Sequence, residues 1–275
     1  METTLPSSPP PTTAVASRVA GARLLEAGPA RQAVFAVLIV ALWQGLSTGV
    51  LSPAVLPSPV VVLSRAAELI WTGALPRDLA TSCGRILVGY AAGAALGIPA
   101  GLLIGRFVWV ERLVGPCLAF VRSIPPIAFV PFSIIVFGIG EASKYAIIFY
   151  LVFIVLALSA AAGVRETPRI RVRAAQALGA GRATVLLRVI LPSAFPFILT
   201  GLRVALSLAF MAVVSAELIG ARSGLGHLIM RSQTMFETDT MLVGILSLGV
   251  LGALLDRGAD ALIRRVLGRF ANQAA

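Results

Sequence analysis

The stretch TPRIRVRAAQALGAGRATVLLRVILPSAFPFILTGLR, Thr167–Arg203, decides how the chain folds. A short helix is predicted over 170–178, and Gly179 ends it because glycine is common just past a helix C-terminus. A second helix is predicted over 183–190 and ends at Pro192, because proline interrupts a helix. The sequence therefore predicts a helix–glycine–helix segment that is rich in arginine.

On both sides of this segment the chain consists of long apolar runs, each of a length that suits a membrane-spanning helix. Between the first two runs, residues 60–71 have an apolar face broken by Arg65 and Glu68, which favours a helix lying in the membrane interface. The predicted spans are Gln32–Val50, Gly84–Gly105, Leu113–Ile139, Tyr145–Val164, Phe195–Ile219 and Met241–Leu255. We therefore expect an all-α polytopic membrane protein with six transmembrane helices.

The composition of the 275 residues agrees, with 58% hydrophobic and only 13% charged residues and a mean hydropathy of +0.93. Ordinary soluble domains have about 45–50% apolar and about 25% charged residues. These values exclude a disordered chain, a soluble domain and a disulfide scaffold. The net charge of +11 does not indicate nucleic acid, since no hydrophilic domain carries a basic face. Two cysteines and one histidine predict no metal, cofactor or catalytic site.

The basic residues indicate the orientation of the chain in the membrane. With the N-terminus inside, fifteen arginines fall in inner segments and five basic residues in outer ones, while three more lie at or inside span ends. Cytoplasmic segments are enriched in this way, so both termini are predicted to be cytoplasmic. The predicted organisation is a disordered cytoplasmic tail (1–31), a transmembrane domain (32–270) with a cytoplasmic loop (165–193), and a short tail (271–275).

Five glycines recur every four residues in the second predicted span: Gly89, Gly93, Gly97, Gly101 and Gly105. At that spacing they share one helix face, where small residues let another helix approach closely. The pattern is compatible with packing inside the chain and with a hinge or a seam between two chains. In both cases the residues are candidate helix-packing positions.

A second set of residues suggests a path through the membrane. Arg122 lies about 13 Å into the third predicted span at about 1.5 Å per residue, and Pro125 and Pro126 must interrupt that helix. A charge at that depth is functional by default, although snorkelling and contacts with freed carbonyl groups remain open. Arg203 is close enough to the inner face to snorkel, and Glu217 suits either a gate or a salt bridge with Arg222. We expect positive groups and no buried acid in the membrane interior.

On physical grounds the arginine-rich segment is equally suited to docking a protein and to contacting anionic lipid heads. Its residues Ala174, Ala175, Gly179, Leu191 and Pro192 resemble the EAA motif of ABC importer permeases, at every interval of that motif. The departure is Arg173, which stands where the motif has Glu. The resemblance extends over roughly residues 56–270, and VRSIPPIAFVPFSIIVFGIGEASK and VVSAELIGARSGLGHLI are similar to the nitrate, sulfonate and taurine branch.

The resemblance implies a type I ABC importer permease fold in a bacterial inner membrane, with Arg173 and the matching motif residues contacting an ATPase. It also implies a second permease chain, two cytosolic ATPase subunits and a periplasmic or lipid-anchored binding protein. The chain has no G-x-x-x-x-G-K-[ST], so ATP hydrolysis is expected in other subunits. The implied substrate is a small anion such as a sulfonate, taurine or nitrate, with bicarbonate or a thiamine-precursor pyrimidine as alternatives. A secondary transporter is the alternative function.

Overall fold

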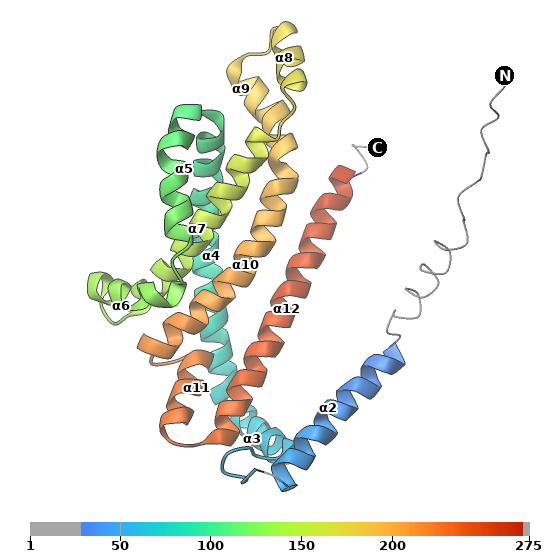
Figure 1. Cartoon of the computed structure of the whole chain (residues 1–275), viewed down its shortest axis with the longest axis vertical. Helices are drawn as coiled ribbons and strands as arrows, with labels where there is room; N and C mark the ends of the chain where they lie inside the picture. The colour runs from blue at the N-terminus through green and yellow to red at the C-terminus, as the bar shows by residue number, and fades with distance from the viewer. Residues whose placement is uncertain (1–28, 50, 272–275) are drawn as a thin grey trace, which may run out of the picture. The chain divides into compact units, whose positions relative to one another are not determined.

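The computed structural model describes residues 29–49 and 51–271, all of whose regular elements are helices (Figure 1). This confirms the all-α fold class. The chain divides into two units, residues 1–59 and 60–275, which are described separately. Of the predicted tails, residues 1–28 and 272–275 lie outside the described residues, whereas residues 29–31 and Ala271 are helical.

The first unit contains helix α2, Pro29–Gly49, where the first span was predicted. Over Ala33–Gly49 its side chains are mostly apolar and mostly exposed, as expected for a helix that contacts lipid. The loop after α2 folds back onto the helix end. Trp43 Nε1 donates to the Pro57 carbonyl at 3.0 Å, and Ser47 Oγ donates to the Leu56 carbonyl at 2.9 Å.

The second unit begins within α3, Pro59–Trp71, the helix predicted at the interface. Four helices in it are long and apolar enough to cross a membrane, over Ala74–Arg106, Glu141–Arg165, Arg182–Gly220 and Thr238–Ala261. The elements that follow α3 are α4 (Ala74–Arg106), α5 (Val108–Arg122), α6 (Pro126–Phe137), α7 (Glu141–Arg165), α8 (Arg169–Ala177), α9 (Arg182–Val185), η1 (Leu186–Ile190), α10 (Leu191–Gly220), α11 (Leu225–Thr234) and α12 (Thr238–Ala271).

The third predicted span is broken into α5 and α6, whose axes differ by 101°. The interruption lies at Pro125 and Pro126, as predicted, because Pro126 begins α6 and has no N–H to continue the preceding helix. This bent pair would make a fifth span, and the described apolar part of α2, Ala33–Gly49, is shorter than the other four. The count of six spans stays a prediction.

One expected boundary is wrong, because the second helix of the arginine-rich segment does not end at Pro192. The chain remains helical from Arg182 to Gly220. A π-helical turn, η1, precedes Pro192, and the N–H of Leu191 donates to the carbonyl of Leu186 instead of that of Leu187. The wider turn gives room for the proline ring, and proline is tolerated in the first turn of α10.

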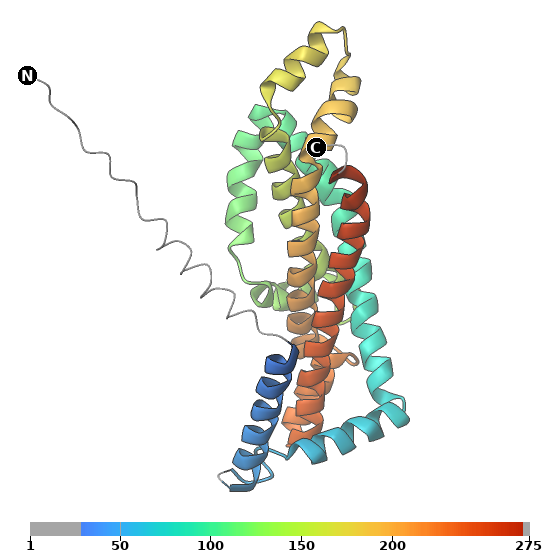
Figure 2. The same cartoon turned by 90° about the vertical axis from the view of Figure 1, so that its right-hand side faces the viewer.

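The core of the second unit lies between α4, α7 and α10, and α7 is the most buried of the spans (Figure 2). The five glycines of α4 all lie against α7. A Cβ added at Gly101 would lie 2.3 Å from the Ala157 carbonyl oxygen, and one at Gly97 would lie 2.8 Å from that of Phe153. This glycine face is therefore covered by α7 of the same chain, with backbone nearly touching backbone.

Candidate functional site

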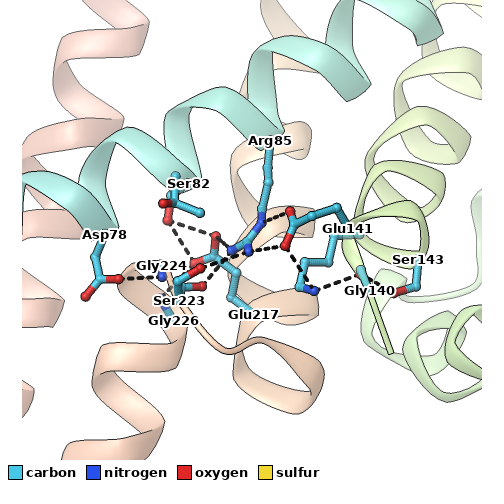
Figure 3. A network of polar contacts seen from close by, with 12 residues as sticks. Asp78, Ser82, Arg85, Gly140, Glu141, Ser143, Glu217, Ser223, Gly224 and Gly226 are labelled. Atoms are coloured by element: carbon cyan, nitrogen blue, oxygen red, sulfur yellow. Dashed lines mark hydrogen bonds and ion pairs between the residues drawn. The ribbon is translucent and has the colours of Figure 1, made fainter. Parts of the chain in front are cut away.

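A buried network of polar side chains joins α4, α7, α10 and the turn before α11 (Figure 3). Its centre is Arg85 of α4, whose side chain is 1% exposed. The guanidinium donates to Glu141 through Nε and Nη2, both at 2.6 Å, and through Nη1 to Glu217 at 2.8 Å. Nη1 also donates to the Ser223 carbonyl at 2.7 Å. A single arginine thus connects three helices and a turn.

Glu217 is fully buried in α10, and its carboxylate accepts hydrogen bonds from two other helices, α4 and α11. Besides Arg85, the donors are Ser82 Oγ at 2.8 Å and the Gly226 N–H at 2.9 Å. A buried carboxylate is costly unless it is paired and hydrogen-bonded, and every requirement is met here. The residue therefore holds the start of α11 against α4.

Two glycines make this arrangement possible. Gly224 has a φ of +109°, and a Cβ there would lie 2.5 Å from the Glu217 carboxyl carbon. A Cβ at Gly226 would lie 2.7 Å from the Glu217 Cβ. The N–H groups at the start of α11 then reach side chains of α4, since Gly224 donates to Asp78 at 2.7 Å and Leu225 donates to Ser82 at 3.0 Å.

These contacts correct one expectation. Glu217 does not pair with Arg222, which is exposed, but with Arg85, and it is buried within the protein in the last turn of α10. Sequence reasoning missed Arg85 as a site residue, because only its position at the end of a span was visible. The spacing from Glu217 to the two glycines was the available signal, since a glycine pair close to an acid at a span end suits a backbone turn around a carboxylate.

A cavity of about 720 Å³ lies between α5, α7 and α10. Arg122 and Arg165 line it, and no acid occurs among its described lining residues. Arg165 is paired with Glu111 of α5, whereas Arg122 has no ion pair or side-chain hydrogen bond within the described part of the chain. The apolar lining residues include Val155, Leu158, Phe197, Val204 and Leu208. The cavity thus offers one unpaired cation in a mostly apolar wall.

The other residues of the predicted path do not lie together in this cavity. Pro125 and Pro126 form the break just after Arg122, and neither lines the cavity. Arg203 is half-exposed on α10 and pairs with Asp260 of α12. Glu217 belongs to the network around Arg85, which starts from the first turns of α4 and the last turn of α10.

The predicted coupling residues occupy a hairpin of α8 and α9. Arg173, Ala174 and Ala175 lie on α8, and Gly179 ends it with a φ of +81°, the left-handed conformation expected of that glycine. Leu191 and Pro192 begin α10, on the far side of the hairpin. Within the described residues, no group of three or more His, Cys, Asp or Glu side chains is placed to hold a metal ion.

Comparison with known proteins places this architecture in one family. Residues 97–268 match the model of the binding-protein-dependent transport system inner membrane component family. The taurine transport system permease protein of Escherichia coli is 39% identical over 236 residues, 84% of this chain and 86% of that protein. A putative aliphatic sulfonates transport permease protein of Bacillus subtilis is 34% identical over 231 residues, 84% of each.

The fold also matches a solved structure. The inward-facing MetNI methionine ABC transporter superposes with a TM-score of 0.64 at 21% identity, over 72% of this chain and 98% of that one. At that identity the match concerns the fold alone. Together with the family match, which covers more than half of the chain, it leaves one assignment. The chain belongs to the binding-protein-dependent transport system inner membrane component family, the permeases of ABC importers.

Proposed function

We propose that this permease forms the membrane pathway of an ATP-driven importer for a small organic anion, of the sulfonate or zwitterionic sulfonate class. A second permease chain completes the pathway, a binding protein delivers the solute, and ATPase subunits dock on the α8–α9 hairpin. The names of the taurine and aliphatic sulfonate relatives support this substrate class. The family description, which specifies dependence on a binding protein, supports the partners.

The observation that carries the substrate class is the unpaired Arg122 in the cavity wall. A cation in a largely apolar wall lowers the barrier for an anion and raises it for a cation. The planar guanidinium also matches a sulfonate or carboxylate in geometry, because it donates two parallel hydrogen bonds. The break between α5 and α6 places this residue at the end of a helix, beside the cavity.

A secondary transporter, the alternative function, would couple transport to an ion or a proton through an acid within the membrane. Glu217 is such an acid by burial, but its carboxylate is already bound by Arg85, Ser82 and the Gly226 N–H. That saturation favours a structural role. Strict dependence of uptake on ATP, with no uptake driven by an ion gradient alone, separates the two functions.

The test is uptake of radiolabelled taurine into proteoliposomes that contain the chain, its ATPase and its binding protein. We expect Arg122→Gln to lower the uptake rate by on the order of tenfold, because the positive potential at the cavity is lost. Arg122→Lys should retain part of the uptake rate because the positive charge remains, although the two parallel hydrogen bonds of the guanidinium are lost. Arg203→Gln is the matched control, because that arginine is engaged by Asp260 and does not line the cavity.

Assembly of each variant complex is measured by size-exclusion chromatography in detergent. Normal uptake by assembled Arg122→Gln complexes would refute the anion path. Equal losses for Arg122→Gln and Arg203→Gln would show that the loss follows from removing any arginine of these helices, and the cavity would have no special role.

A further inference from the structure

The hairpin of α8 and α9 carries an unusual charge pattern. Between Thr167 and Ser193 the chain has five arginines and no acidic residue. All five are exposed, and none forms an ion pair or a side-chain hydrogen bond with another residue that the structure describes. The five are Arg169, Arg171, Arg173, Arg182 and Arg188. No charge within the hairpin balances them.

The two faces of α8 have different tasks. Val172 and Ala175 face inward and pack on the cluster that contains Val185 and Ile190. At about 100° per residue, Ile170, Ala174 and Ala177 lie on the opposite face. All three are exposed, Ile170 by 73%, and Leu178 at the end of the helix is 89% exposed.

The arginines flank this outer apolar strip. By the same helical geometry, Arg173 lies on one side of the strip and Arg171 on the other. Neither side chain is needed to hold the hairpin together, because the inward face supplies its packing. The outer surface of α8 is therefore a narrow apolar strip with arginine on both sides, and the described part of the chain leaves it exposed.

The position of the hairpin argues for a protein and against a lipid surface. The continuous helix Arg182–Gly220 has 39 residues. At about 1.5 Å per residue it is about 58 Å long, whereas the hydrocarbon core of a membrane is about 30 Å thick. Figures 1 and 2 both show α8 and α9 beyond the ends of α5 and α12. The hairpin thus projects beyond the ends of α5 and α12, as expected of a segment that reaches past the membrane.

We propose, on the basis of the function proposed above, that the ATPase surface receiving α8 is an apolar groove with carboxylates on its rim. Ile170, Ala174 and Leu178 enter the groove, and Arg173 pairs with an Asp or Glu of the ATPase. A related ATPase that carries a cation at this point would suit a permease with an acidic residue here. Arg173 repels such an ATPase. The permease thereby selects its own ATPase among related ones.

The experiment measures binding of the co-expressed ATPase to the purified permease in nanodiscs, at several concentrations of NaCl. We expect wild-type affinity to fall as salt rises, because exposed charge pairs are screened. Arg173→Glu should weaken binding at low salt by at least about tenfold and remove most of the salt dependence. Arg257→Glu is the matched control, since Arg257 is an exposed arginine in the second half of α12 and lies outside the hairpin.

A photo-crosslinking residue at position 170 then identifies the ATPase segment in contact. We expect an Asp or Glu in that segment, and its replacement by Arg should restore the binding of Arg173→Glu. A segment without an acid, or no rescue by the reversed charge, would overturn the acidic rim. If the wild-type permease binds no ATPase at all, the proposed function itself fails.

The lipid alternative is tested in the same assay. Nanodiscs of phosphatidylcholine alone are compared with nanodiscs that contain phosphatidylglycerol. If Arg173→Glu weakens ATPase binding only in the anionic discs, the arginine acts through lipid heads and the proposal is wrong. An equal effect in both discs supports a direct contact between the two proteins.

Discussion

At the scale of single residues, the main buried polar contact is the ion pair of Glu217 and Arg85. An ion pair away from water is stable only when the remaining hydrogen-bonding positions are also filled, because desolvation of both charges opposes the attraction. Here Ser82, Ser223 and the Gly226 N–H fill them. No buried side-chain polar atom in the described residues lacks a partner. The pair thus acts as a brace for the turn between α10 and α11.

The first prediction is that Glu217→Gln destabilises the folded chain by about 3 kcal/mol, near the lower end of the range for breaking a buried pair. The amide keeps one acceptor and Arg85 keeps Glu141, which limits the loss. The control is Glu68→Gln on α3, where the partner Arg65 forms an exposed pair. That change should cost less than about 1 kcal/mol. Unfolding curves in detergent measure both, and similar costs would show that burial of Glu217 does not matter.

The pairing of Arg85 with Glu217 was not predictable from local sequence. The two residues are 132 positions apart, and Arg222 offered a nearer partner for the same acid. Only the packing of α4 against α10 brings them together. By contrast, the left-handed conformation of Gly179 was predictable, because a glycine that follows a short helix has one common role.

At the scale of whole elements, the contact between α4 and α7 organises the second unit. The glycine face of α4 removes side chains from the interface, so that dispersion and weak Cα–H···O contacts act between backbones. A Cβ at Gly105 would lie 2.7 Å from the Ala161 carbonyl oxygen, so the close approach continues to the last turn of α4.

The second prediction concerns this interface. Gly101→Ala adds a methyl group 2.3 Å from the Ala157 carbonyl oxygen and 2.7 Å from the Ala160 Cβ. We expect a loss of about 1–3 kcal/mol, the usual cost of overpacking. Gly84→Ala on the same helix has no atom within 4 Å of the new Cβ, so it should be neutral or stabilising by up to about 1 kcal/mol. Melting temperatures in detergent compare the two, and equal shifts would contradict a tight α4–α7 contact.

Element prediction succeeded where side-chain pattern alone decides the outcome. The apolar runs located the long helices, and two adjacent prolines located the break between α5 and α6. It failed at Pro192, because a π-helical turn accommodates the ring and such a turn has no signature in residue types. The sixth predicted span ended at Leu255, whereas α12 continues through Asp256 and Arg257 to Ala271.

At the scale of the second unit, the basic residues separate towards two ends. The hairpin, the end of α4 and the far end of α12 lie together at one end, and α11 lies at the other (Figure 1). The hairpin end carries Arg106, Arg112, Arg165 and the five arginines of the hairpin. The α11 end carries fewer basic residues, and Arg85 and Lys144 there are engaged by Glu141. This unequal distribution of basic residues favours a cytoplasmic location for the hairpin end.

The last prediction concerns this orientation. In a variant whose two cysteines, Cys83 and Cys117, are replaced by Ala, a new cysteine is introduced at Gly181 or at Arg222, both of which are exposed. With the chain expressed without its ATPase, a membrane-impermeant maleimide should label Arg222→Cys in intact spheroplasts. It should label Gly181→Cys only after the membrane is opened, because α10 carries the chain from one side to the other between the two positions. The reverse pattern would invert the topology and place the α8–α9 hairpin, the proposed ATPase contact, on the wrong side. Labelling of both positions from the same side would mean that Arg182–Gly220 does not cross the membrane.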